Sequence, residues 1–176
     1  MIGRLDELNQ LERFYNSSKF EFLTMYGRRR IGKTTILREF AGRHKALFFS
    51  AQEKNDSLNL LDFSKMVQTF FKGSFISSFQ NWEAEFEYIT GKISDEKLVL
   101  IIDEFPFLAE PNPSIKSILQ HTIDHVWKGK NIFLIWRVRN FSQIIVKQRK
   151  QLLMEFWAVF QDIWRRFPLR FHWRKI

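Results

Sequence analysis

One short segment constrains the fold of this chain more than any other feature. Residues 27–34, Gly-Arg-Arg-Arg-Ile-Gly-Lys-Thr, match the pattern G-x-x-x-x-G-K-S/T in full. The apolar run at 20–26 is typical of a buried strand, and the stretch 34–43 is typical of a helix. A glycine-bearing loop between a strand and a helix belongs to the unit from which parallel α/β sheets are built. The segment therefore predicts an α/β fold organised around this loop.

The remaining strands are predicted from short apolar runs at 46–51, 98–102 and 131–135. The run at 98–102 is apolar throughout, as expected for a strand that is buried on both faces of a parallel sheet. Helical segments separate these runs, so we expect a parallel sheet flanked by helices.

The helices are predicted from apolar spacing and from capping residues. A helix is expected at 5–14, another through Phe71 with Asp56 or Ser57 as its cap, and a third capped by Asn81. A loop at 106–113 and a last helix at 114–128 complete this part of the chain.

The loop at 27–34 has the chemistry of a phosphate site. Glycines let the backbone turn its N–H groups toward phosphate oxygens, and the helix that follows presents its positive dipole end. Lys33 would reach the β- and γ-phosphates of a nucleotide and assist catalysis, and the Thr34 hydroxyl would bind Mg²⁺. The predicted nucleotide contacts from this segment are Gly27, Arg28, Arg29, Arg30, Ile31, Gly32, Lys33, Thr34 and Thr35.

Two acids follow the apolar run at 98–102. A buried strand can deliver a carboxylate from its carboxyl end to a metal beside a triphosphate, so we predict that Asp103 binds Mg²⁺. Glu104 is placed to orient or deprotonate a water for attack on the γ-phosphate, which makes it the predicted catalytic carboxylate.

Other charged residues in this part of the chain allow more than one interpretation. The side chains of Arg28, Arg29 and Arg30 could touch nucleotide or a neighbouring subunit, or form a solvated loop. Glu83, Glu85 and Glu87 alternate along a predicted helix and do not converge on one face, so we expect them on a solvated surface.

The net charge of +9 is unevenly distributed. Residues 1–135 hold 18 basic and 17 acidic residues, a net of +1, and residues 136–176 hold 10 basic and 2 acidic residues, a net of +8. The second segment also holds four of the six Trp and none of the seven Gly. We therefore expect two parts, a core at 1–135 and a basic aromatic tail at 136–176.

The tail supports several interpretations. Apolar residues near three- and four-residue spacing predict an amphipathic helix at 143–166 with Lys147, Arg149 and Lys150 exposed, and alternation at 169–173 predicts an edge strand. Such a helix could lie on an anionic membrane, pack on a partner or cover the core. Basic residues among aromatic ones also suit nucleic-acid binding.

The residues up to 135 resemble the archaeal-type ATPase family, a STAND-related branch of the AAA+-like P-loop ATPases. The resemblance rests on Ile2-Gly3-Arg4, on the Walker A segment 27–34, and on the Walker B run 98–104 with the residues after it. It implies an ATP-binding core with strand order 5-1-4-3-2. It also implies that Ile2, Gly3 and Arg4 lie near the adenine, although this segment could equally be a simple cap of the first helix.

The sequence departs from that family after the fourth predicted strand. Such ATPases carry a small polar segment there that senses the γ-phosphate, whereas this chain has Trp136-Arg137-Val138-Arg139-Asn140. Family members also continue into a fifth strand and a helical lid. One hypothesis is that the chain is truncated, or that a frameshift near codon 136 replaced the native continuation, which the two alternative reading frames of the gene would test.

The predicted function is ATP binding with Mg²⁺-dependent hydrolysis to ADP and phosphate. The alternatives are a nucleotide-dependent switch with little turnover and a basic nucleic-acid-binding protein. A protein partner or self-association is compatible with each of these functions. A chain without cysteine, a secretory signal or an apolar run long enough to cross a membrane is expected in the cytoplasm.

Overall fold

The computed structural model describes residues 5–26, 32–73 and 77–138. The predictions for 1–4, 27–31 and the tail beyond 138 lie outside the described residues. Within the described part, none of the helices is long and apolar enough to cross a membrane.

Four parallel strands form the sheet in the described part of the chain. They are β1 (Glu21–Tyr26), β2 (Ala46–Ser50), β3 (Leu98–Asp103) and β4 (Ile132–Val138), in the spatial order β1-β4-β3-β2. The predicted α/β fold with a parallel sheet is confirmed. The full order 5-1-4-3-2 is not reproduced, because the described sheet has four strands and the edge strand predicted at 169–173 lies outside the described residues.

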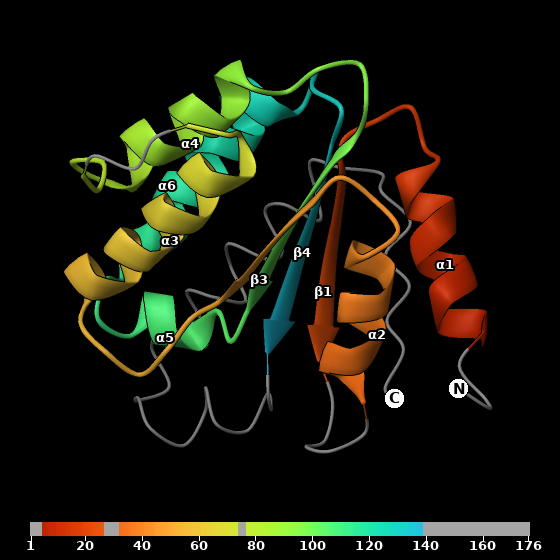
Figure 1. The fold of residues 1–176 in the computed structure, drawn as a ribbon, viewed down its shortest axis with the longest axis horizontal. Helices are drawn as coiled ribbons and strands as arrows, with labels where there is room; N and C mark the ends of the chain where they lie inside the picture. The colour runs from red at the N-terminus through yellow and green to blue at the C-terminus, as the bar shows by residue number, and fades with distance from the viewer. Residues whose placement is uncertain (1–4, 27–31, 74–76, 139–176) are drawn as a thin grey trace.

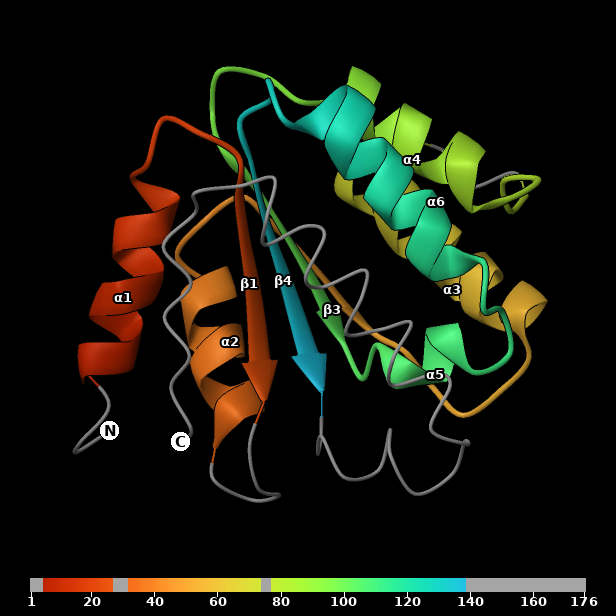
Figure 2. The ribbon, with the colours of Figure 1, turned by 180° about the vertical axis from the view of Figure 1, so that it is seen from behind.

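Helices cover both faces of the sheet (Figures 1 and 2). On one face lie α1 (Leu5–Tyr15) and α2 (Lys33–Ala41). On the other lie α3 (Asp56–Phe70), α4 (Trp82–Gly91) and α6 (Ile115–Thr122), which continues as the π-helical turn η1 (Ile123–Trp127). A short helix α5 (Pro106–Ala109) follows β3 where a loop was predicted, because Pro106 begins it at a position where a missing N–H has no cost.

Alternation along the central strands divides the core into two clusters. In β3, Leu98, Leu100 and Ile102 pack toward α3, α4 and α6, whereas Val99 and Ile101 pack toward α1 and α2. The side-chain period of two in a strand explains this division. Because both faces are covered, all residues of β3 and β4 are buried.

Asparagine side chains cap two of the helices. The side-chain oxygen of Asn81 accepts from the Ala84 N–H at 2.9 Å at the start of α4, as predicted. At the start of α3 the cap is Asn55, which accepts from the Leu58 N–H at 2.9 Å, so the assignment to Asp56 or Ser57 was wrong by one or two residues. Each cap satisfies a backbone donor that a helix start leaves without a partner.

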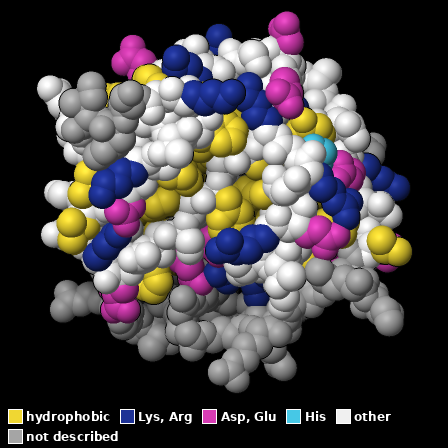
Figure 3. Space-filling model, in the orientation of Figure 1, with side chains coloured by type: hydrophobic (Ala, Val, Ile, Leu, Met, Phe, Trp, Pro, Cys, Tyr) yellow, Lys and Arg dark blue, Asp and Glu magenta, His cyan; other side chains and the backbone are white. Residues whose placement is uncertain are grey.

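The edge strand β2 is partly shielded. Figure 3 shows hydrophobic side chains in the middle of one face of the molecule, with Lys and Arg around them. Phe48 of β2 is partly buried, and the Arg38 guanidinium of α2 lies 4.9 Å from the centre of its ring. A cation over the ring covers part of the apolar surface that this strand leaves exposed.

The prediction that Glu85 lies on a solvated surface was wrong. Glu85 is fully buried, whereas Glu83 and Glu87 are exposed. The buried residues of α4 are Trp82, Glu85, Phe86 and Ile89, spaced three and four residues apart along one face. Glu85 therefore faces the core, where it accepts a hydrogen bond from the Ser64 hydroxyl of α3.

Candidate functional site

The predicted site residues gather at one edge of the sheet. All four strands are parallel, so their carboxyl ends meet at this edge, and α2 begins there (Figures 1 and 2). Of the predicted phosphate loop, the structure describes Gly32 to Thr35; Gly27 to Ile31 lie outside the described residues, as do Ile2, Gly3 and Arg4.

The start of α2 has the local geometry that the glycine pattern predicts. Gly32 is the N-cap residue of α2 and has a φ of 77°, a left-handed conformation that costs glycine little and most other residues more. Its carbonyl accepts from the Ile36 N–H at 3.1 Å. The next residue, Lys33, is buried, Thr34 is partly exposed and Thr35 is exposed.

Asp103 and Glu104 end β3 and begin the turn to α5. Only 2% of Asp103 and 5% of Glu104 are exposed. Glu104 has a φ of 60°, which is unfavourable for a residue with a side chain and costs about 1–2 kcal/mol. Strained backbone of this kind is concentrated at functional sites, where surrounding structure holds it.

Hydrogen bonds from both neighbouring strands hold this turn. The Asp103 carbonyl accepts from the Ala51 N–H at 2.9 Å just after β2, and the Phe105 N–H donates to the Arg137 carbonyl of β4 at 3.3 Å. The Phe105 ring stacks on Trp136 of β4, with centroids 4.2 Å apart and planes 5° from parallel. These contacts keep Glu104 in its left-handed conformation.

Arg137 is the site residue that the sequence analysis did not assign. It lies in β4 between its register partners Met25 of β1 and Asp103 of β3. Its Nε donates to Asp103 Oδ1 and its Nη2 donates to Glu104 Oε1. Burial alone would lower the pKa of Arg137, but the hydrogen bonds and the charges of the two acids outweigh it and raise that pKa. The sequence signal that could have identified Arg137 is a charged residue after a buried apolar run, as at Asp103.

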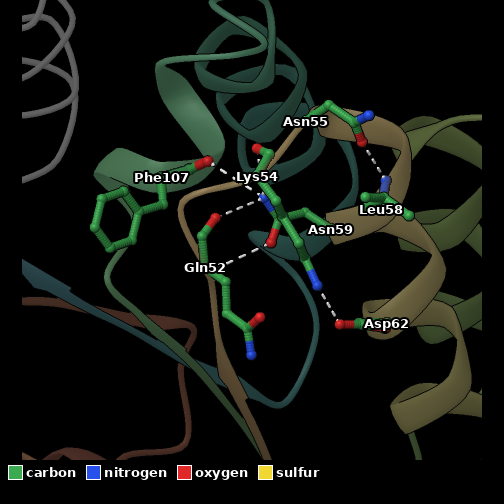
Figure 4. Close-up of polar contacts among 7 residues, drawn as sticks. All are labelled: Gln52, Lys54, Asn55, Leu58, Asn59, Asp62 and Phe107. Carbon is green, nitrogen blue, oxygen red and sulfur yellow. Dashed lines mark hydrogen bonds and ion pairs between the residues drawn. The ribbon is translucent and has the colours of Figure 1, made fainter.

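A second polar group supports the loops beside the site (Figure 4). The buried side chain of Asn59 in α3 accepts from the Gln52 N–H at 3.2 Å and donates to the carbonyl of the same residue at 3.1 Å. It also donates to the carbonyls of Lys54 and of Phe107 in α5, each at 3.4 Å. One buried amide thus joins the loop after β2 to the helix that follows the two acids.

The fold and the arrangement of this edge define an α/β protein of the P-loop ATPase class. The chain belongs to the family described as an ATPase domain predominantly from Archaea, whose model matches residues 1–161. The resemblance stated from the sequence is confirmed, and the match continues past residue 135, where the composition changes.

The chain is also similar to individual proteins. The uncharacterized protein MJECL04 of Methanocaldococcus jannaschii is 31% identical over 134 residues, which is 76% of this chain and 28% of that protein. The Walker-type ATPase PABY2304 of Pyrococcus abyssi has a TM-score of 0.57 at 15% identity, over 90% of this chain and 49% of that one. Cdc6p of Pyrobaculum aerophilum has a TM-score of 0.58 at 16% identity, over 86% and 42%. The chain thus spans half or less of each of these proteins, and the two structures bear on the fold alone.

Proposed function

We propose that this domain binds ATP at the carboxyl-end edge of the sheet and hydrolyses it to ADP and phosphate with Mg²⁺. One observation carries the proposal: two buried acids end β3 at the edge where α2 begins with Gly32 and Lys33. This is where a P-loop ATPase needs a metal carboxylate and a water-orienting carboxylate. Membership of an archaeal ATPase family supports it, and we extend it to the STAND-related branch.

The donor chemistry of the site suits magnesium. Mg²⁺ prefers hard oxygen ligands, and the Thr34 hydroxyl and the Asp103 carboxylate are of this kind. We propose that these two residues hold the ion, which would neutralise charge on the β- and γ-phosphates.

The other protein groups would position the attacking water and stabilise the charge on the phosphates. Lys33 at the start of α2 would neutralise the γ-phosphate, and the backbone N–H groups of that helix end favour an anion. Glu104 would accept a proton from the attacking water or orient it. Gly27 to Ile31 and Ile2 to Arg4 remain the predicted contacts to phosphate and adenine.

Binding and hydrolysis are tested separately with two variants. Lys33→Ala should weaken ATP binding about tenfold or more, because a charge-assisted contact to phosphate is lost. Glu104→Gln should keep ATP binding and reduce phosphate release by about a hundredfold or more, as expected for loss of a general base. Matched controls are Lys45→Ala, which precedes β2, and Glu110→Gln, which is exposed after α5. ATP binding without phosphate release that depends on Glu104 would reject the hydrolase proposal.

A specific observation favours a second candidate, a nucleotide-dependent switch with little turnover. Arg137 already pairs with both acids that hydrolysis would use. If wild type binds ATP but releases phosphate no faster than Glu104→Gln does, the switch is the better description.

Our proposals about binding partners and domain organisation concern the basic tail. We propose that the part of the basic segment 136–176 that follows β4 contacts nucleic acid, a protein partner or a second copy, and that the protein is cytoplasmic. The net charge of +8 in that segment supports a phosphate-rich partner. Replacing Lys147, Arg149 and Lys150 by Gln should weaken salt-dependent DNA binding, and unchanged binding would exclude these residues as DNA contacts.

A further inference from the structure

A single guanidinium lies between the two acids of the candidate site. Asp103, Glu104 and Arg137 are each at least nine-tenths buried, and Arg137 is ion-paired with both carboxylates. The two acids bring a charge of −2 and the guanidinium +1, so the group retains −1. An arginine keeps its charge at any pH that the protein experiences, so this compensation is permanent while the contacts last.

A guanidinium and a divalent ion at one carboxylate compete, because both are attracted by the same negative charge. Asp103 Oδ1 accepts the Nε–H of Arg137, and Asp103 is also the carboxylate proposed to bind Mg²⁺. A divalent ion at Asp103 therefore binds beside a cation that already pairs with the carboxylate. It also meets a local charge of −1 where two free acids would present −2, which weakens its attraction.

The backbone holds Asp103 and Arg137 close to each other. Asp103 and Arg137 are register partners in adjacent central strands, and the stacking of Phe105 on Trp136 holds the residues beside them. The two chain segments are fixed relative to each other, so the ion pairs are broken by side-chain rotation and not by separation of the strands.

We infer that Arg137 is a positioning residue that occupies the place of a metal ion: it holds Asp103 and Glu104 together in the nucleotide-free protein, and it competes with a divalent cation for the Asp103 carboxylate. The inference rests on the proposed function, because Asp103 is a metal ligand only there. It predicts that removing the Arg137 guanidinium strengthens the binding of a divalent cation at Asp103.

The test is Mn²⁺ binding, measured by electron paramagnetic resonance on the full chain without nucleotide. Arg137→Met should bind Mn²⁺ about tenfold or more tightly than wild type, because the competing charge is removed. Arg137→Lys should fall between them, since an ammonium keeps the charge but lacks the planar fork that reaches two carboxylates. The control is Arg43→Met, which removes a half-exposed guanidinium paired with Glu39 and Glu12 near the other end of α2.

Thermal unfolding with and without Mn²⁺ adds a readout independent of activity. Arg137→Met removes a guanidinium that pairs with two buried acids, so Mn²⁺ should raise its Tm more than it raises that of wild type. If this variant stays unfolded even with Mn²⁺, the Arg137→Lys comparison decides the question. Equal Mn²⁺ affinities of wild type and the folded Arg137 variants would overturn the inference.

A separate measurement, nucleotide binding, tests the proposed function. A fluorescent ATP analogue, titrated into wild type in EDTA and in Mg²⁺, reports nucleotide binding directly. A wild type that binds no nucleotide refutes the proposed function, whereas the Mn²⁺ comparison still decides what Arg137 does.

Discussion

The buried carboxyl group of Glu85 should make the stability of this protein depend on pH. Glu85 lies on the core-facing side of α4, where its Oε2 accepts from the Ser64 hydroxyl, and Oε1 has no partner in the part of the chain that the structure describes. Burial raises the pKa of Glu85 from 4.5 to about 7, although the Ser64 hydrogen bond opposes the increase. Within that interval the folded protein keeps a proton that the unfolded chain releases.

The sign and the size of the effect follow from this difference. Below pH 4.5 Glu85 is protonated in both states and does not affect the folding equilibrium. As the pH rises from 4.5 to about 7, ionisation favours the unfolded chain, so the free energy of unfolding falls. An increase of about 2.5 pH units at 1.36 kcal/mol each gives a loss of about 3 kcal/mol above pH 7.

Glu85→Gln removes the titration and keeps an oxygen that can accept from Ser64. Urea unfolding at several pH values should show the variant gaining about 3 kcal/mol on wild type between pH 4.5 and about pH 8. The control Glu87→Gln changes an exposed carboxyl of the same helix and should follow wild type. A difference between Glu85→Gln and wild type that does not change with pH would refute the reasoning.

Three further substitutions test buried polar contacts by urea unfolding. Lys97→Met removes an ammonium that donates to three carbonyls at and after the end of α1, and should cost about 2 kcal/mol; a loss below about 0.5 kcal/mol would contradict this. Asn59→Ala should lower the free energy of unfolding by about 2–3 kcal/mol, because it removes several buried hydrogen bonds. Asn55→Ala removes only the cap of α3 and should lower it by about 1 kcal/mol. Equal losses for the two variants would count against the role of Asn59. Thr90→Val removes the acceptor 2.8 Å from the Trp127 indole nitrogen and should cost about 1–2 kcal/mol, whereas an unchanged free energy of unfolding would show that this indole finds another partner.

Several features of the fold were predictable because they depend on short stretches of chain. The apolar run at 98–102 predicts a strand that is buried on both sides, and the structure places β3 at Leu98–Asp103 between two neighbours. Asn81 was predicted as a cap and caps α4, because a cap involves residues three positions apart. The predicted end of the fourth strand at 135 was three residues short, since the apolar run that predicted it stops at Ile135 whereas β4 continues to Val138.

Part of the site was also predictable, because its two motifs are short stretches of chain. Gly32 and Lys33 begin α2, and Asp103 and Glu104 end β3, as the two sequence motifs indicate. The roles of these residues in nucleotide and metal binding remain predictions. Glu85 shows the limit of reasoning from charge alone, because the three-and-four spacing of its apolar neighbours determines which face of α4 it occupies.

What the sequence determined by itself is the α/β class, the glycine loop before α2 and the two acids after a buried strand. Each of these follows from the local spacing of a few residues. The family resemblance implied that the fourth strand lies between the first and the third, but only the tertiary structure decided that Arg137 meets Asp103 and Glu104 from a position 33 to 34 residues further along the chain. Strand order is set by how helices and strands bury each other's apolar faces, and no local pattern in the chain records it. The guanidinium between two acids is thus a property of the assembled sheet.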